Sequence, residues 1–129
     1  MTSSIPAIKV IAMPKDANPD GDIFGGWIIS MMDLAGAIIA RSVAKTRIVT
    51  VAVNNMSFHL PVYIGDCVEC YGEVVHMGRT SLRVRVETWV ERRNNRIKEK
   101  VTEGEFVFVA IGKDRKPIPI HHPNQEDLL

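Results

Sequence analysis

One stretch, residues 25–40 (GGWIISMMDLAGAIIA), most constrains the fold, because it reads as a helix that is apolar on almost every side. A helix without a polar stripe is normally buried. Arg41 follows the stretch, where a cation stabilises the negative end of a helix dipole. Apart from the Trp27 indole, only Ser30 and Asp33 carry hydrogen-bonding side chains here. The sequence therefore predicts a central helix with other elements wrapped around it.

Asp33 is the informative residue of this helix. Burying an unpaired carboxylate costs several kcal/mol, so the acid must have a partner or take part in chemistry. Two plainer interpretations stay open: Asp33 faces solvent at a helix edge, or it pairs with Arg41 or another basic residue. A membrane span is disfavoured, because the run falls short of the ~20 apolar residues that a bilayer needs and holds an acid near its middle.

The length and composition of the chain indicate the class of protein but do not identify a partner. The chain has 129 residues, which predicts a single domain over residues 1–129. Its 16 basic and 15 acidic residues give a net charge of +1, so we expect no general attraction to nucleic acid or to a membrane. No secretory signal is visible at the N-terminus, and we expect a cytoplasmic protein.

Cys67 and Cys70 have the C-x-x-C spacing of zinc and redox sites. Residues three apart on a strand point to opposite faces, and no second cysteine pair completes a zinc set. We therefore interpret both as small reduced hydrophobic residues and predict no metal site.

Strand-like segments surround the helix in the sequence. They cover residues 5–13, 48–59, 66–76, 81–91 and 98–111. The alternation is clearest in residues 81–91, where Leu82, Val84, Val86 and Val90 share one face. This order predicts an α+β fold in which a curved antiparallel sheet of about five strands wraps around one long helix. The second face of the sheet and its edges would be left uncovered in a single copy, which favours at least a dimer. The tail from about residue 117 is expected to be weakly ordered.

Gly25 and Gly26 open the predicted helix after a loop rich in turn residues. The first amides of a helix have no internal partner, and glycines let a ligand approach them closely. Such a helix N-terminus can hold a developing negative charge. Alternatively, the glycines only make room for Trp27 or for a neighbouring strand.

Several separated motifs occur together in this chain. They are residues 12–18 (AMPKDAN), 21–27 (GDIFGGW), 32–37 (MDLAGA), 49–53 (VTVAV), Phe58, 61–62 (PV), 65–66 (GD) and 78–81 (GRTS). Together they resemble the hotdog-fold acyl-CoA thioesterases, in particular the bacterial YciA type. The resemblance implies a hotdog fold and an enzyme that hydrolyses acyl-CoA to a free acid and CoA.

The resemblance also implies roles for individual residues. The catalytic acid of the family falls on Asp33, as a general base on water or, less often, as a nucleophile. The Gly-Asn or Gly-Asp position of the family falls on Asp22, and the oxyanion donors fall on the amides around Gly25 and Gly26. It further implies a site at a homodimer interface, with Asp33 of one subunit facing the glycine turn of the other, and assembly as a trimer of dimers. CoA is part of the substrate, so no separate cofactor is expected.

CoA carries phosphates, and arginine and lysine are their usual partners. The basic candidates are Arg79, Arg83, Arg85, Lys113, Arg115 and Lys116, although each could equally be a solvated surface charge. Thr80 and Ser81 are candidates for contacts with the pantetheine arm. The candidate acyl-pocket residues are Ile28, Met31, Met32 and Phe58, which core packing would explain equally well.

Two rival functions remain at this stage. A hotdog enoyl-acyl hydratase or dehydratase would use a histidine with an acid, but neither His59 nor His76 lies on the helix or its entry loop. A non-catalytic acyl-CoA sensor would bind the ester without releasing a thiol.

Overall fold

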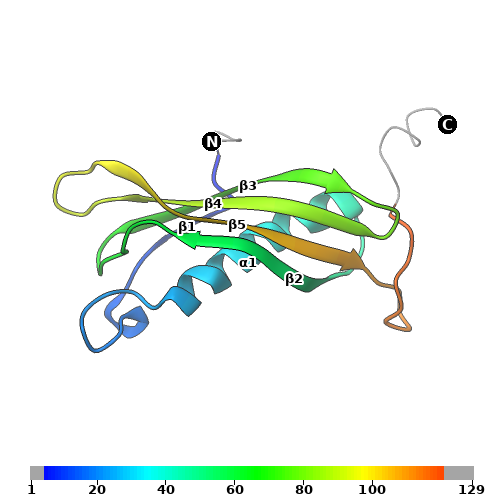
Figure 1. The fold of residues 1–129 in the computed structure, drawn as a ribbon, viewed down its shortest axis with the longest axis horizontal. Helices are drawn as coiled ribbons and strands as arrows, with labels where there is room; N and C mark the ends of the chain where they lie inside the picture. Colours follow the sequence, from blue (N-terminus) through cyan, green and yellow to red (C-terminus); the bar gives the residue numbers. More distant parts are fainter. Residues whose placement is uncertain (1–4, 121–129) are drawn as a thin grey trace.

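The computed structural model of the protein describes residues 5–120, in which one long helix packs along one five-stranded antiparallel sheet (Figure 1). In chain order the elements are β1 (Ile8–Ile11), a short 3-10 helix η1 (Pro14–Asp16), α1 (Gly25–Ala44), β2 (Ile48–Phe58), β3 (Cys67–Met77), β4 (Ser81–Glu91) and β5 (Lys98–Ala110). The strand order is β1-β3-β4-β5-β2. The predicted fold of one helix and an antiparallel sheet is confirmed, and β1 and β2 form the sheet edges.

The central strand β4 has the bounds that its alternating pattern predicts. Its residues Leu82, Val84, Val86 and Val90 are all fully buried against the helix side. Register shifts interrupt the pairing of β2 with β5 and of β3 with β4. Bulges of this kind increase local twist and bend a strand, which helps the sheet to curve along α1.

Helix α1 packs through one face, not through every face as its sequence suggests. The buried positions are Ile28, Met32, Ala35, Gly36, Ala40 and Ala44. Small residues let the helix approach the sheet so closely that a Cβ on Gly36 would lie 3.0 Å from the Phe108 ring. On the other side, Leu34 and Ile38 are each 52% exposed. A single copy therefore leaves an apolar helix face uncovered.

The helix is also longer than the predicted run. It continues to Ala44 and ends at Lys45, whose backbone is left-handed with φ 56°. At 20 residues it is long and apolar enough to cross a membrane by length and composition alone. The core helix of a globular protein passes the same test, and here α1 contacts all five strands of the sheet.

The segment after β5 was expected to be weakly ordered from about residue 117. The amide of Ile118 donates to the Ala110 carbonyl at 2.9 Å, and that of Ile120 donates to the Arg79 carbonyl at 2.8 Å. Ile120 is buried. These bonds fix the segment to the sheet as far as Ile120, and residues 121–129 lie outside the described part of the chain.

Candidate active site

Asp33 lies near the middle of α1, on the side that faces the edge strand β2. The Thr50 hydroxyl on β2 donates to Asp33 Oδ1 at 2.7 Å. Asp33 is half-buried, and its partner is this hydroxyl, not Arg41. Within residues 5–120, the second carboxylate oxygen has no protein donor, so it is available to a water molecule or a substrate.

Sequence reasoning missed Thr50, because the two residues are 17 positions apart. No local motif marks such a pair. The packing of α1 against the start of β2 brings them together.

The glycine turn forms the N-terminus of α1. Phe24 is the N-cap residue, and no side chain caps the helix. A Cβ on Gly26 would meet nothing within 4 Å, whereas one on Gly25 would lie 3.4 Å from the Phe58 ring. The Gly26 side of the turn is therefore open, and uncapped amides at a helix N-terminus are suited to bind an anion or an oxyanion.

A hollow of about 410 Å³ adjoins this turn. It is lined by Asn18, Asp22, Ile23, Gly25, Ile28, Phe58, His59, Leu60, Pro61 and Val62. Of the predicted acyl-pocket residues, Ile28 and Phe58 line it, whereas Met32 is fully buried in the core and Met31 packs against that core. Its lining combines apolar side chains with a few polar groups, as ligand pockets commonly do.

Asn18 is a second residue that sequence reasoning did not single out. Its Oδ1 accepts hydrogen bonds from the amides of Asp20 at 2.9 Å and Asp22 at 3.0 Å. Its side-chain oxygen is therefore committed to the loop, which leaves the side-chain NH₂ group as a donor at the hollow. Asp22 itself is exposed, and its backbone is bonded to Asn18 in both directions. An asparagine just before a turn-rich loop is the signal that could have identified it.

His59 also lines the hollow, although its sequence position suggested that it lies away from the site. Its Nε2 lies 3.0 Å from Glu103 Oε1. Glu103 also accepts from Arg85 at 2.9 Å. These hydrogen bonds, that of Arg85 first, lower the pKa of Glu103 to about 2.

Asp33 and the glycine turn lie well apart within one chain. Gly26 and Asp33 are seven residues apart, which places them on one helix face but about 11 Å apart along the axis. A reacting carbonyl must lie about 3 Å from both its base-bound water and its oxyanion donors. An antiparallel helix from a second copy would set Asp33 against the partner's glycine turn.

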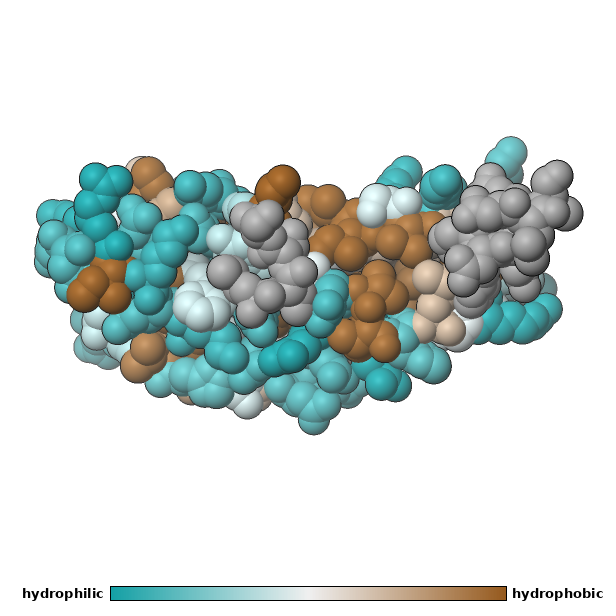
Figure 2. Space-filling model, turned by 90° about the horizontal axis from the view of Figure 1, so that it is seen from above, coloured by the Kyte–Doolittle hydropathy of each residue, from teal (hydrophilic) through white to brown (hydrophobic). Residues whose placement is uncertain are grey.

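Apolar surface is available for such a copy. On the edge strand β2, Val51 and Val53 are 55% and 45% exposed, and they continue the uncovered face of α1. Seen from the β3 side of the sheet, further apolar side chains gather on the surface while most of the remainder is hydrophilic (Figure 2). Exposed apolar patches of this kind mark interaction surfaces.

Most of the predicted phosphate-binding residues lie together at the other end of the sheet. The Thr80 carbonyl accepts from Ala110 at 2.9 Å, which holds the turn with Arg79 and Ser81 against the strand that leads to Lys113, Arg115 and Lys116. Among the described residues, none of these four cations pairs with a carboxylate. Arg83 is different, because it lies 3.9 Å from Glu105 on the sheet.

A hollow of about 320 Å³ lies at this basic end, and it adds Arg47 to the set. Arg47 and Lys113 line it together with Ile111 and Ile118. The amide of Ile111 donates to the Arg47 carbonyl at 3.0 Å, so the start of β2 joins the cluster. Cations next to an apolar floor suit a ligand that combines phosphate with a flat ring.

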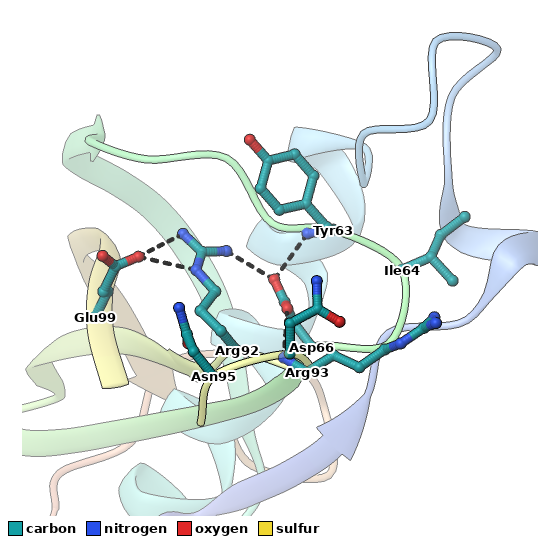
Figure 3. Close-up of a pocket in the computed structure, with 8 residues that line it drawn as sticks. Tyr63, Ile64, Asp66, Arg92, Arg93, Asn95 and Glu99 are labelled. Carbon is teal, nitrogen blue, oxygen red and sulfur yellow. Dashed lines mark hydrogen bonds and ion pairs between the residues drawn. The ribbon is translucent and has the colours of Figure 1, made fainter. Parts of the chain in front are cut away.

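A further hollow, of about 510 Å³, lies at the opposite end of the sheet from this basic end (Figure 3). Within it, Arg92 forms ion pairs with Asp66 at 2.7 Å and with Glu99 at 2.8 Å. The Arg92 guanidinium also lies 5.3 Å from the centre of the Tyr63 ring. This arrangement closes the end of the sheet and leaves Arg92 no free charge for a ligand.

The C-x-x-C pair and a possible metal site are the remaining candidates from the sequence. Cys67 and Cys70 are free thiols, and burial raises the pKa of Cys70 to about 11. Among residues 5–120, no group of three or more His, Cys, Asp or Glu side chains could hold a metal ion.

The fold and this site define the class of the protein. The family model of the thioesterase superfamily matches residues 20–96, and the chain belongs to this family. It is 44% identical over 116 residues to the acyl-CoA thioester hydrolase YciA of Salmonella typhimurium, covering 88% of this chain and 87% of the relative. The predicted resemblance is thereby confirmed.

Solved structures agree with this assignment. A hexameric hotdog fold thioesterase of Campylobacter jejuni superposes with a TM-score of 0.90 at 39% identity, covering 99% of this chain and 98% of that one. A hexameric thioesterase from Yersinia pestis gives a TM-score of 0.88 at 37% identity, covering 94% and 99%. The fold is therefore a hotdog fold.

Proposed function

We propose that the protein hydrolyses acyl-CoA thioesters to a free acid and CoA. The observation that carries the proposal is the placement of Asp33. It is held by Thr50 at 2.7 Å, keeps one oxygen free, and lies on the same helix face as the uncapped turn at Gly26. The name of the Salmonella typhimurium relative supports the same substrate class.

The residues supply the two elements that thioester hydrolysis needs. The free oxygen of Asp33 takes a proton from water, whose oxygen then attacks the thioester carbon. The carbonyl oxygen becomes an oxyanion, which the amides of Gly25 and Gly26 in the second copy of the chain stabilise, with the Asn18 NH₂ group of that copy as a further donor. Collapse breaks the C–S bond, and the CoA sulfur leaves and takes up the proton.

Rough magnitudes show that these groups suffice. General-base assistance contributes about 10²–10⁴ in rate, and a placed oxyanion donor about 10²–10³. Because the proton transfers and charge stabilisation are all supplied by these groups, we propose that no metal or cofactor takes part.

The homodimer is the minimal active unit in this proposal. The separation of about 11 Å between Gly26 and Asp33 supports it, as do the exposed apolar residues on β2 and α1. The Campylobacter jejuni and Yersinia pestis neighbours are hexameric. Because a two-fold dimer at β2 leaves the β3 side free, we propose a trimer of such dimers.

The basic end is proposed to hold the CoA phosphates. Arg47 lies just before β2 and precedes Thr50 by three residues, which places its Cα about 10 Å from that of Thr50, the partner of Asp33. An extended pantetheine arm bridges a distance of this size. Arg79, Lys113, Arg115 and Lys116 then face the phosphates, while Arg83 contributes less because it is paired with Glu105.

The net charge of +1 supports the absence of a nucleic-acid partner. The packing of α1 on the sheet supports its role as a core helix and not as a membrane span. Cytoplasmic localisation stays a prediction.

Thiol release from a panel of acyl-CoAs tests the function, with wild type compared to Asp33→Asn. We expect Asp33→Asn to lower kcat by at least about 10²-fold with the fold retained. Full activity in this variant would refute the role of Asp33. Tight binding of the ester without thiol release would indicate a sensor, and loss of enoyl absorbance without thiol release would indicate a hydratase.

A further inference from the structure

Among the described residues, the hydroxyl oxygen of Thr102 on β5 is the one buried polar side-chain atom without a hydrogen-bond partner. Its side chain is 0% exposed, and Oγ1 has no hydrogen-bond partner. Leaving a buried hydroxyl unpartnered costs about 1–3 kcal/mol. Native proteins contain few such groups, and each calls for an explanation.

The neighbours of Thr102 form one row across the inner face of the sheet. The backbone register pairs Cys70 with Thr88, Thr88 with Thr102, and Thr102 with Phe58. The Thr88 hydroxyl lies 3.5 Å from Cys70 Sγ, so it has a partner. In this row, the Thr102 hydroxyl is therefore the one without a hydrogen-bond partner. Its neighbour on the edge strand β2 is Phe58.

Phe58 stands between Thr102 and the hollow at the glycine turn. Directly opposed side chains on neighbouring strands have Cβ atoms about 5 Å apart. The Phe58 ring also lines the hollow and approaches Gly25, where a Cβ would lie 3.4 Å from it. Phe58 is 50% exposed, so its ring has room to change rotamer. Thr102 does not line the hollow, so its hydroxyl can be reached from there only if the Phe58 ring turns aside.

We propose that Thr102 is a specificity-determining residue at the inner end of the acyl pocket, where its hydroxyl hydrogen-bonds an oxygen carried by the acyl chain. The substrate class is a hydroxy- or oxo-acyl thioester. The proposal rests on the proposed function, because it requires the thioester carbonyl to bind at the Gly25 and Gly26 amides and the acyl chain to enter the hollow that Phe58 lines. A plain alkyl chain fills the same space but leaves the hydroxyl unpartnered.

Thr102→Val tests the proposal, since it removes the hydroxyl and keeps the branched shape. The substrates are hexanoyl-CoA and hexanoyl-CoA hydroxylated at each carbon from 3 to 6, and the readout is the ratio of kcat/KM for each hydroxylated ester to that for hexanoyl-CoA. A neutral hydrogen bond is worth about 0.5–1.5 kcal/mol, so for at least one position we expect Thr102→Val to lower the ratio by about 2- to 10-fold. Thr102→Ser, which keeps the hydroxyl, should retain most of the wild-type ratio.

Thr88→Val is the matched control, because it removes a neighbouring hydroxyl that already has a partner. It should leave the ratio at its wild-type value. Ratios in Thr102→Val equal to those of wild type at every position would overturn the proposal. Thr102→Val should fold, since it deletes an unpartnered polar group, and its thermal unfolding reports this directly. Absence of thiol release from hexanoyl-CoA in wild type would instead refute the hydrolase function itself.

Discussion

Replacing Thr50 by valine removes one hydrogen bond from Asp33 and little else. Valine has nearly the shape of threonine but no hydroxyl. The bond joins a hydroxyl to a carboxylate at 2.7 Å, within the range of strong charge-assisted bonds. Bonds to charged groups contribute about 1.5–3 kcal/mol. If the bond acts by holding the carboxylate toward the attacking water, its full value appears in the activation barrier, and kcat falls by about 10- to 150-fold.

The assay is steady-state thiol release from one acyl-CoA, with Thr50→Ser as the matched control. Serine keeps the donor, so this variant should remain within about 3-fold of wild type, well under the 1.4 kcal/mol that a tenfold change requires. Circular dichroism and thermal unfolding verify that both variants fold. Because Asp33 is half-buried, water can replace the lost donor and the fold should persist.

A double-mutant cycle isolates the pair. If Thr50 acts only through Asp33, then adding Thr50→Val to Asp33→Asn should lower kcat little further, because residues in one hydrogen-bond network are not additive. Wild-type kcat in a folded Thr50→Val variant would refute the reasoning. Equal losses in both backgrounds would show that Thr50 acts through another group.

Three further outcomes follow from the structure. Val53→Glu places a charge on the exposed apolar edge of β2 and should reduce both the oligomer mass in light scattering and the activity. Ile97→Glu, at a similarly exposed site on the hairpin between β4 and β5, should change neither. An active monomer would contradict a site shared between two copies. Arg79→Ala should raise KM for acyl-CoA about 2- to 5-fold, as expected for the loss of an exposed ion pair. The increase should be smaller for a pantetheine thioester, and equal increases for the two substrates would argue against phosphate binding by Arg79. The pKa of Glu103 is lowered from 4.5 to about 2, so its contribution to stability is complete above pH 4.5 and disappears as the pH falls toward 2. Glu103→Gln should therefore lose less stability than wild type over this pH interval in denaturant titrations. Identical acid profiles of the two proteins would count against the pairing of Glu103 with Arg85 and His59.

Local patterns in the sequence determined the elements of this fold. The period of two over residues 81–91 predicted β4 with its observed bounds. The apolar run from Gly25 predicted α1, and the single acid in that run drew attention to Asp33. The separated motifs identified the family. These signals are short-range, because hydrophobic periodicity and turn chemistry act over a few residues.

Only the tertiary structure decided which distant groups meet. Thr50 reaches Asp33 because β2 packs beside α1, and Phe58 lies between Gly25 and Thr102 because β2 pairs with β5 in one particular register. The uncovered face of α1 is likewise invisible in a run that is apolar all round, since the sequence does not say which side the sheet covers. Contacts of this kind depend on strand register and helix rotation, which the chain fixes by packing as a whole and not by any local motif.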